Sequence, residues 1–158
     1  MEENDKSTEK IINQFFLSPA AGKRLIAKSI LHIPAIADAI ENRTVVVIAG
    51  TTNGYVVEEI FKKKKQEFDF SRKRFFRGVS LPAGYETTDA GILPDEGKFP
   101  GDVVIEKGVW NKGKTIIDVV DSLQKGDIII KGANAVNLKT GQADLHPFYS
   151  KYAMTVQN

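Results

Sequence analysis

Short β-branched runs alternate along this chain with stretches whose apolar residues recur at helical spacing. The run TVVVIA at residues 44–49 is apolar on both faces, which is typical of a strand covered on both sides. The runs VVIE (103–106) and IIIK (128–131) each follow a Gly-Asp pair and enclose a helical pattern over residues 114–123. We therefore expect a βαβ unit there, with its two strands parallel.

Helical spacing and capping residues predict four helices in the first part of the chain. Ser18-Pro19 is a typical helix start, because a serine N-cap precedes a proline at the first helical position. The predicted ranges are 7–17, 19–31, 34–42 and 55–65. In the helix that starts at Pro19, the pattern predicts an inward face of Leu25, Ile26, Ile30 and Leu31 and an outward face of Lys23, Arg24 and Lys28.

Strands that alternate with helices favour an α/β fold. We expect a single domain over residues 1–158, built on a three-layer, mostly parallel, Rossmann-like sheet with helices on both faces. Its irregular parts are a leading segment (1–17), a long loop (82–101) and a weakly structured tail (137–158). Further strands are predicted within 66–81, ending at Leu81, and over 152–156 at the sheet edge.

Composition narrows the class of protein. Of the 158 residues, 42% are hydrophobic and 27% charged, and the net charge is +2, as in an ordinary globular domain. The absence of cysteine excludes disulfides, thiolate metal sites and cysteine nucleophiles. The polar, acidic first residues do not resemble a targeting peptide, and the longest apolar run, 45–49, is too short to cross a bilayer. We therefore expect a cytoplasmic protein with no membrane partner.

The segment Gly50-Thr51-Thr52-Asn53-Gly54 is the first candidate binding site. It joins a predicted strand to a predicted helix, and the start of a helix offers free amide groups and partial positive charge to an anion. Glycines permit close backbone approach, while threonine and asparagine add side-chain donors. The alternative is a plain turn in which these side chains only cap the helix.

Lys131-Gly132-Ala133-Asn134 is the second candidate, at the end of the strand IIIK. If that strand is parallel to 44–49, both segments line the same edge of the sheet. The lysine could then meet a phosphate or carboxylate, and the asparagine could orient a hydroxyl. The alternative is a glycine turn with an exposed lysine.

Residues 108–115 (GVWNKGKT) fit the phosphate-loop pattern GxxxxGK[ST]. Val109 and Trp110 are bulky for a loop wrapped around phosphate, and Lys131 ends the next strand where a magnesium-holding aspartate would be expected. We therefore interpret this segment as a turn before a helix with a basic start, and not as a nucleotide site.

Residues 62–77 carry eight basic and two acidic side chains, interleaved with four phenylalanines. Proteins that bind nucleic acid use such patterns for phosphate contact and base stacking. Lysines that answer a helix dipole and phenylalanines that pack a strand would explain the same pattern. The phenylalanines are Phe68, Phe70, Phe75 and Phe76.

No metal or cofactor is expected. His32 and His146 stand alone, without a carboxylate or second histidine at ligand spacing, and no nucleophile motif occurs. Carboxylates in the predicted long loop are free to act as acid or base. The candidates for catalysis there are Glu86, Asp89 and Glu96.

The segments TVVVIAGTTNGYVVEEI (44–60) and GDIIIKGANAV (126–136) resemble the superfamily that includes ribose-phosphate isomerases, glucosamine-phosphate deaminases, CoA transferases and sugar-sensing repressors. Residues 18–136 as a whole are similar to a group of microbial proteins in that superfamily, of which this chain would be a short member. The resemblance implies that residues 50–54 hold a ligand's phosphate and that residues 132–134 lie beside its sugar.

These observations predict a homo-oligomeric protein that binds a small phosphorylated or carboxylated metabolite. Two alternatives remain open. One is a nucleic-acid-binding module that uses residues 62–77, and the other is a sugar-phosphate isomerase-like enzyme with a loop carboxylate as its base.

Overall fold

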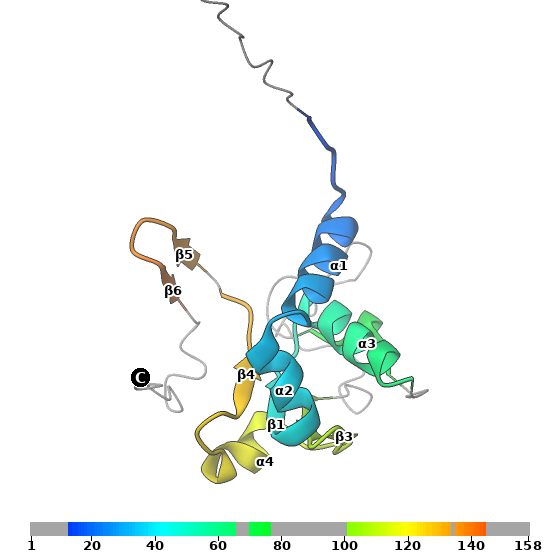
Figure 1. Ribbon diagram of the computed structural model, residues 1–158, viewed down its shortest axis with the longest axis vertical. Coiled ribbons are helices and arrows are strands. Elements are labelled where there is room, and N and C mark those ends of the chain that lie inside the picture. Colours follow the sequence, from blue (N-terminus) through cyan, green and yellow to red (C-terminus); the bar gives the residue numbers. More distant parts are fainter. Residues whose placement is uncertain (1–12, 66–69, 77–100, 134, 145–158) are drawn as a thin grey trace, which may run out of the picture.

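A four-stranded mixed sheet lies at the centre of the computed structural model, which describes residues 13–65, 70–76, 101–133 and 135–144 (Figure 1). Its spatial order is β3-β2-β1-β4, and a separate two-stranded hairpin joins β5 to β6. The strands of the sheet are β1 (Thr44–Val47), β2 (Val103–Glu106), β3 (Val109–Trp110) and β4 (Ile128–Ile130), and those of the hairpin are β5 (Ala135–Asn137) and β6 (Gln142–Asp144).

The strand directions overturn the predicted three-layer, mostly parallel, Rossmann-like sheet. Only β4 is parallel to β1, whereas β2 is antiparallel to both β1 and β3. The predicted βαβ unit is wrong as well, because β2 and β4 lie on opposite sides of β1 and run in opposite directions. The cause lies at Lys107 and Gly108, whose φ angles of 48° and 79° suit a tight hairpin turn. The chain therefore turns from β2 directly into β3.

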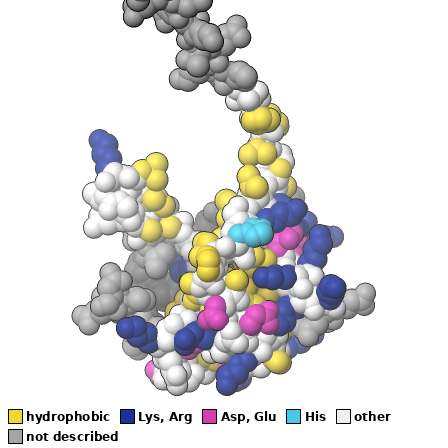
Figure 2. Space-filling model, in the orientation of Figure 1, with side chains coloured by type: hydrophobic (Ala, Val, Ile, Leu, Met, Phe, Trp, Pro, Cys, Tyr) yellow, Lys and Arg dark blue, Asp and Glu magenta, His cyan; other side chains and the backbone are white. Residues whose placement is uncertain are grey.

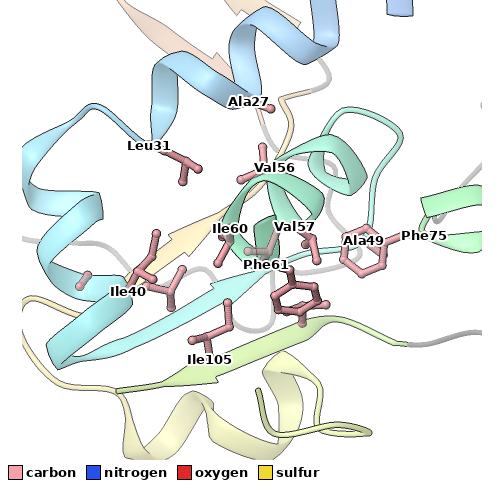
Figure 3. Close-up of a cluster of buried hydrophobic side chains, with 14 residues drawn as sticks. Ala27, Leu31, Ile40, Ala49, Val56, Val57, Ile60, Phe61, Phe75 and Ile105 are labelled. Carbon is pink, nitrogen blue, oxygen red and sulfur yellow. The ribbon is translucent and has the colours of Figure 1, made fainter. Parts of the chain in front are cut away.

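Three helices cover one face of the sheet, and a single helical turn covers the other (Figures 1 and 3). Among the described residues, no helix is both long and apolar enough to cross a membrane. The three helices are α1 (Pro19–Ile30), α2 (Pro34–Asn42) and α3 (Asn53–Lys63). The opposite face carries α4 (Ile116–Val119), which the 3-10 turn η3 (Val120–Ser122) follows. Another 3-10 turn, η1 (Arg72–Arg74), follows α3 along the chain.

Alternation along β1 divides the core into two clusters. Val45 and Val47 face the larger cluster, which Ala27 of α1, Ile40 of α2 and Ile60 of α3 complete (Figure 3). On the opposite face, Val46, Ile48 and Val104 pack against α4 through Ile116 and Val119. Residues 44–49 are therefore covered on both sides, as their composition predicts.

The start of α1 is as predicted, but its faces are predicted only in part: Ile30 and Leu31 pack in the core and Lys28 is exposed, as expected. Ser18 caps the helix, with its hydroxyl oxygen accepting from Ala21 N at 3.2 Å. Leu25 and Ile26 are 54% and 49% exposed instead of inward. Arg24 instead turns toward α3, so the helix is rotated relative to the expectation from its large apolar side chains.

Three other predicted elements differ in the described ranges. Residues 13–17, the end of a predicted helix, are not helical. The predicted helix over 114–123 is reduced to α4 and η3, since its run of β-branched residues has low helix propensity. Residues 70–76 contain η1 and no strand, and the remainder of the strand predicted within 66–81, with its end at Leu81, lies outside the described residues. The predicted strand over 152–156 lies outside the described residues.

Candidate anion-binding site

The loop of residues 50–54 lies at the carboxyl end of β1 and leads directly into α3. Its centre is Asn53, whose side chain is 6% exposed and donates from Nδ2 to the carbonyl oxygens of Ile48, at 2.7 Å, and Ile130, at 3.3 Å. The side chain of Asn53 thus joins the ends of β1 and β4. Its role in the structure is to hold the backbone.

The amides at the start of α3 point to an anion site. Among the described residues, no hydrogen bond engages the backbone N–H of Thr51, Thr52 or Asn53, whereas Gly54 N donates to Gly50 O at 2.9 Å. The first turn of α3 has no acidic residue, and the Thr52 side chain makes no capping bond. Three backbone donors and the positive end of an eleven-residue helix therefore stand together.

Lys23 of α1 brings a cation to this loop. Its Nζ donates to Thr51 Oγ1 at 3.0 Å, in a partly buried position. The outward orientation predicted for Lys23 is therefore wrong. Lys23 lies four residues before Ala27, so the two share one face of the helix, and Ala27 is fully buried. This spacing could have predicted the inward orientation of Lys23, but a small residue such as alanine does not identify the buried face of a helix.

A charged cluster fixes α1 and η1 against α3 beside the loop. The guanidinium carbons of Arg24 and Arg72 lie 4.6 Å and 4.5 Å from the ring centroid of Tyr55. Both arginines pair with Glu58, and Arg24 also pairs with Glu59 at 2.8 Å. Burial alone would lower the pKa of Arg24, but the hydrogen bonds and charges of the two glutamates outweigh it and raise that pKa. These charges are largely neutralised within the cluster.

Gly54 lies so close to η1 that a side chain at this position would not fit, and the neighbouring sequence did not predict this contact. A Cβ built on Gly54 would lie 2.8 Å from the Cβ of Arg72 and 3.4 Å from its Cα. The missing side chain therefore accommodates η1, the turn that carries Arg72. The close approach at Gly54 is made by the protein's own backbone.

The second predicted segment lies beside the first. Because β1 and β4 are parallel, with Val47 opposite Ile130, residues 131–133 leave the sheet at the same edge as residues 50–54. Lys131 is partly buried, and its Nζ donates to Gly132 O at 3.1 Å, while Gly132 and Ala133 are exposed. Asn134 lies outside the described residues.

Asp102 is a buried group at this edge that the sequence did not single out. Its side chain is fully buried, with Oδ1 accepting from Ala49 N at 3.1 Å and Oδ2 accepting from Ile116 N at 3.0 Å. It thus ties the residue before Gly50 to the first residue of α4. The sequence shows a Gly-Asp pair before an aliphatic strand, but no neighbouring residue indicates that the Asp102 carboxylate faces the interior.

The segment that fits the phosphate-loop pattern is a hairpin and a capped helical turn. Gly108 lies in the turn between β2 and β3, and Val109 and Trp110 form β3. Thr115 donates to Asp118 Oδ2 from both its N and its Oγ1, each at 2.7 Å. These bonds lower the pKa of Asp118. The expected turn is thus the β-hairpin that joins β2 to β3.

The phenylalanines of the basic stretch are largely interior. Phe75 and Phe76 are buried, and Phe70 packs edge-on against Phe75 with their centroids 5.2 Å apart. Lys64 pairs with Glu41 at 2.7 Å. On the face shown in Figure 2, acidic side chains lie among the described basic ones. Phe68 lies outside the described residues, and the buried rings are not available for stacking on bases.

The predicted loop carboxylates Glu86, Asp89 and Glu96, and also His146, lie outside the described residues. Within the described ranges, no three side chains of the His, Cys, Asp or Glu type gather as a metal site. Comparisons with protein-family models, with curated proteins and with solved structures found no match.

Proposed function

We propose that this protein binds a small phosphorylated or carboxylated metabolite at the start of α3. The observation that carries the proposal is the meeting of three unengaged backbone amides, those of Thr51, Thr52 and Asn53, with the ammonium group of Lys23. Amides at a helix start bind anions through short, charge-assisted hydrogen bonds. Lys23 adds the positive charge that a dianion such as phosphate requires.

The other residues of this edge have distinct parts in the proposal. The hydroxyls of Thr51 and Thr52 donate to the remaining anion oxygens, while Gly50 and Gly54 shape the turn. Lys131, with Gly132 and Ala133 after it, stands at the neighbouring strand end, where the non-anionic part of the ligand would extend. The resemblance to sugar-phosphate-binding proteins favours a sugar phosphate as that ligand, and Asn134 is then a candidate partner for its hydroxyls.

Thermal unfolding with added anions tests this proposal. Inorganic phosphate and ribose 5-phosphate should raise the melting temperature, because a ligand that binds only the folded state stabilises it by about 2.7 kcal/mol at a hundred times its Kd. Lys23→Met should reduce the rise strongly. Lys28→Met is the matched control on the same helix, since Lys28 is exposed. A rise that is equal in both variants, or no rise with either anion at millimolar concentration, contradicts the proposal.

A further inference from the structure

β4 is an edge strand of the described sheet. It pairs with β1 on one side, and no described strand pairs with its other side (Figure 1). The strand consists of three isoleucines, of which Ile129 is 39% exposed. Proteins protect an exposed edge by keeping the strand short, or with lysine, proline or a bulge inside it. β4 is short, but its three residues include no lysine or proline, so its edge is open to another strand.

The backbone of Ile129 faces the uncovered edge. Ile130 O accepts from Ile48 N at 2.9 Å, so Ile130 directs its polar backbone groups toward β1. Backbone groups alternate in direction along a strand. The N–H and C=O of Ile129 therefore point away from β1, where they can exchange two hydrogen bonds with a residue directly opposite.

The sequence around β4 is complementary to itself when read in the opposite direction. Residues 127–131 are Asp-Ile-Ile-Ile-Lys. In an antiparallel pair centred on Ile129, Asp127 lies opposite Lys131 of the partner subunit, and Lys131 lies opposite Asp127 of the partner subunit. Residues 127, 129 and 131 share one face of the strand, so both charge pairs flank the central isoleucine pair. A parallel pair in the same register would oppose like charges.

We infer that two copies of this chain associate through β4, antiparallel about a twofold axis at Ile129. The association joins two four-stranded sheets into one continuous sheet. Asp127 is fixed at the start of β4, because Oδ1 accepts from Thr44 N at 2.9 Å and Oδ2 accepts from Gln124 N at 2.8 Å. A carboxylate has further acceptor positions for the opposite lysine. The inference stands independently of the anion site.

Sedimentation equilibrium of the full chain tests this interface. The unmodified protein should be a dimer, and Ile129→Lys should be a monomer that keeps its far-UV circular dichroism spectrum, because two ammonium groups would meet at the axis. Val109→Lys is the matched control, since Val109 is 63% exposed on the other edge strand, β3. It should remain a dimer. A monomeric unmodified protein, or a dimer that Ile129→Lys leaves intact, overturns the inference.

A cross-linking variant keeps the inference testable if Ile129→Lys does not fold. The chain contains no cysteine, so Ile129→Cys introduces a single thiol on the proposed axis. Cα atoms opposite each other in a hydrogen-bonded antiparallel pair are about 5.5 Å apart, within reach of a disulfide or a short bis-maleimide. Ile129→Cys should form a covalent dimer in high yield, and Val109→Cys should not. Equal yields from the two variants contradict the proposed interface.

The charge pairs provide a third readout. Lys131→Glu places a carboxylate opposite Asp127 of the partner subunit twice per dimer, so the dimer dissociation constant should rise roughly tenfold at low salt. Lys125→Glu is the control, because Lys125 is exposed and precedes the strand. An unchanged constant for Lys131→Glu contradicts the antiparallel register.

Discussion

The side-chain amide of Asn53 donates to the carbonyl oxygen of Ile130 at 3.3 Å and so joins the start of α3 to the end of β4. The same nitrogen donates to Ile48 O at 2.7 Å. One buried side chain therefore holds the two parallel strand ends and the loop between β1 and α3 in a single arrangement. The loop that presents the three unengaged amides is thus fixed before any ligand arrives.

Asn53→Asp should be strongly destabilising. It replaces a buried donor with carboxylate oxygens that face two carbonyl oxygens, and we expect a loss of about 3 kcal/mol in the free energy of unfolding. Urea denaturation measures it. Asn137→Asp is the control, because the Asn137 side-chain oxygen already accepts from Lys139 N and Thr140 N and a carboxylate preserves both bonds. Equal stability of the two variants would show that the Asn53 bonds contribute little.

Asp102→Asn should also weaken the fold. Each carboxylate oxygen of Asp102 accepts from a different buried amide, and the substitution turns one acceptor into a donor. The expected cost is about 1–3 kcal/mol in the free energy of unfolding. Asp121→Asn, at an exposed position of η3, should change the stability by less than about 0.5 kcal/mol. The proposed role of Asp102 fails if both variants unfold at the same denaturant concentration.

Two glycines should respond oppositely to alanine. Gly54→Ala forces a methyl group against Arg72 and should cost about 1–3 kcal/mol. Gly22→Ala lies within α1, where a Cβ meets nothing within 4 Å, and should stabilise the protein by up to about 1 kcal/mol. Thermal or chemical denaturation of both variants measures the difference. A neutral Gly54→Ala would mean that η1 moves away from α3 at little cost.

The contribution of Asp118 should depend on pH. Hydrogen bonds from Thr115 lower the pKa of Asp118 below its ordinary value of 3.8, so this group stabilises the folded state above that pH and loses the effect as the pH falls through its folded pKa. The stability difference between the unmodified protein and Asp118→Asn should therefore be constant between about pH 5 and 7 and shrink in more acidic solution. A carboxyl carbon titration by NMR that places this pKa at or above 3.8 contradicts the assignment.

Local signals in the sequence were sufficient for several elements. Residue type and immediate neighbours predict the helix cap at Ser18, a strand in the apolar run 44–49, and the aliphatic strands β2 and β4. The structure contains the cap and all three strands. The placement of residues 50–54 beside 131–133 was expected only on the condition that β4 is parallel to β1, and the structure meets that condition.

Long-range geometry was not encoded locally. An aliphatic run does not specify strand direction, and only the turn at Lys107 and Gly108 sends the chain back through β3. The rotation of α1 depends on Arg24 meeting Tyr55, a contact between distant segments, and it exposes Leu25 and Ile26. For the same reason, the sequence did not predict that Lys23 lies at the anion site.

The most direct test of the anion site is a titration of the isotope-labelled protein with inorganic phosphate, followed through the amide NMR signals. We expect the largest shifts at Thr51, Thr52 and Asn53, saturating with phosphate, and a much weaker response in Lys23→Met. Uniformly small shifts at these three amides, or equal shifts in the Lys23→Met variant, would contradict the proposal that the start of α3 binds an anion.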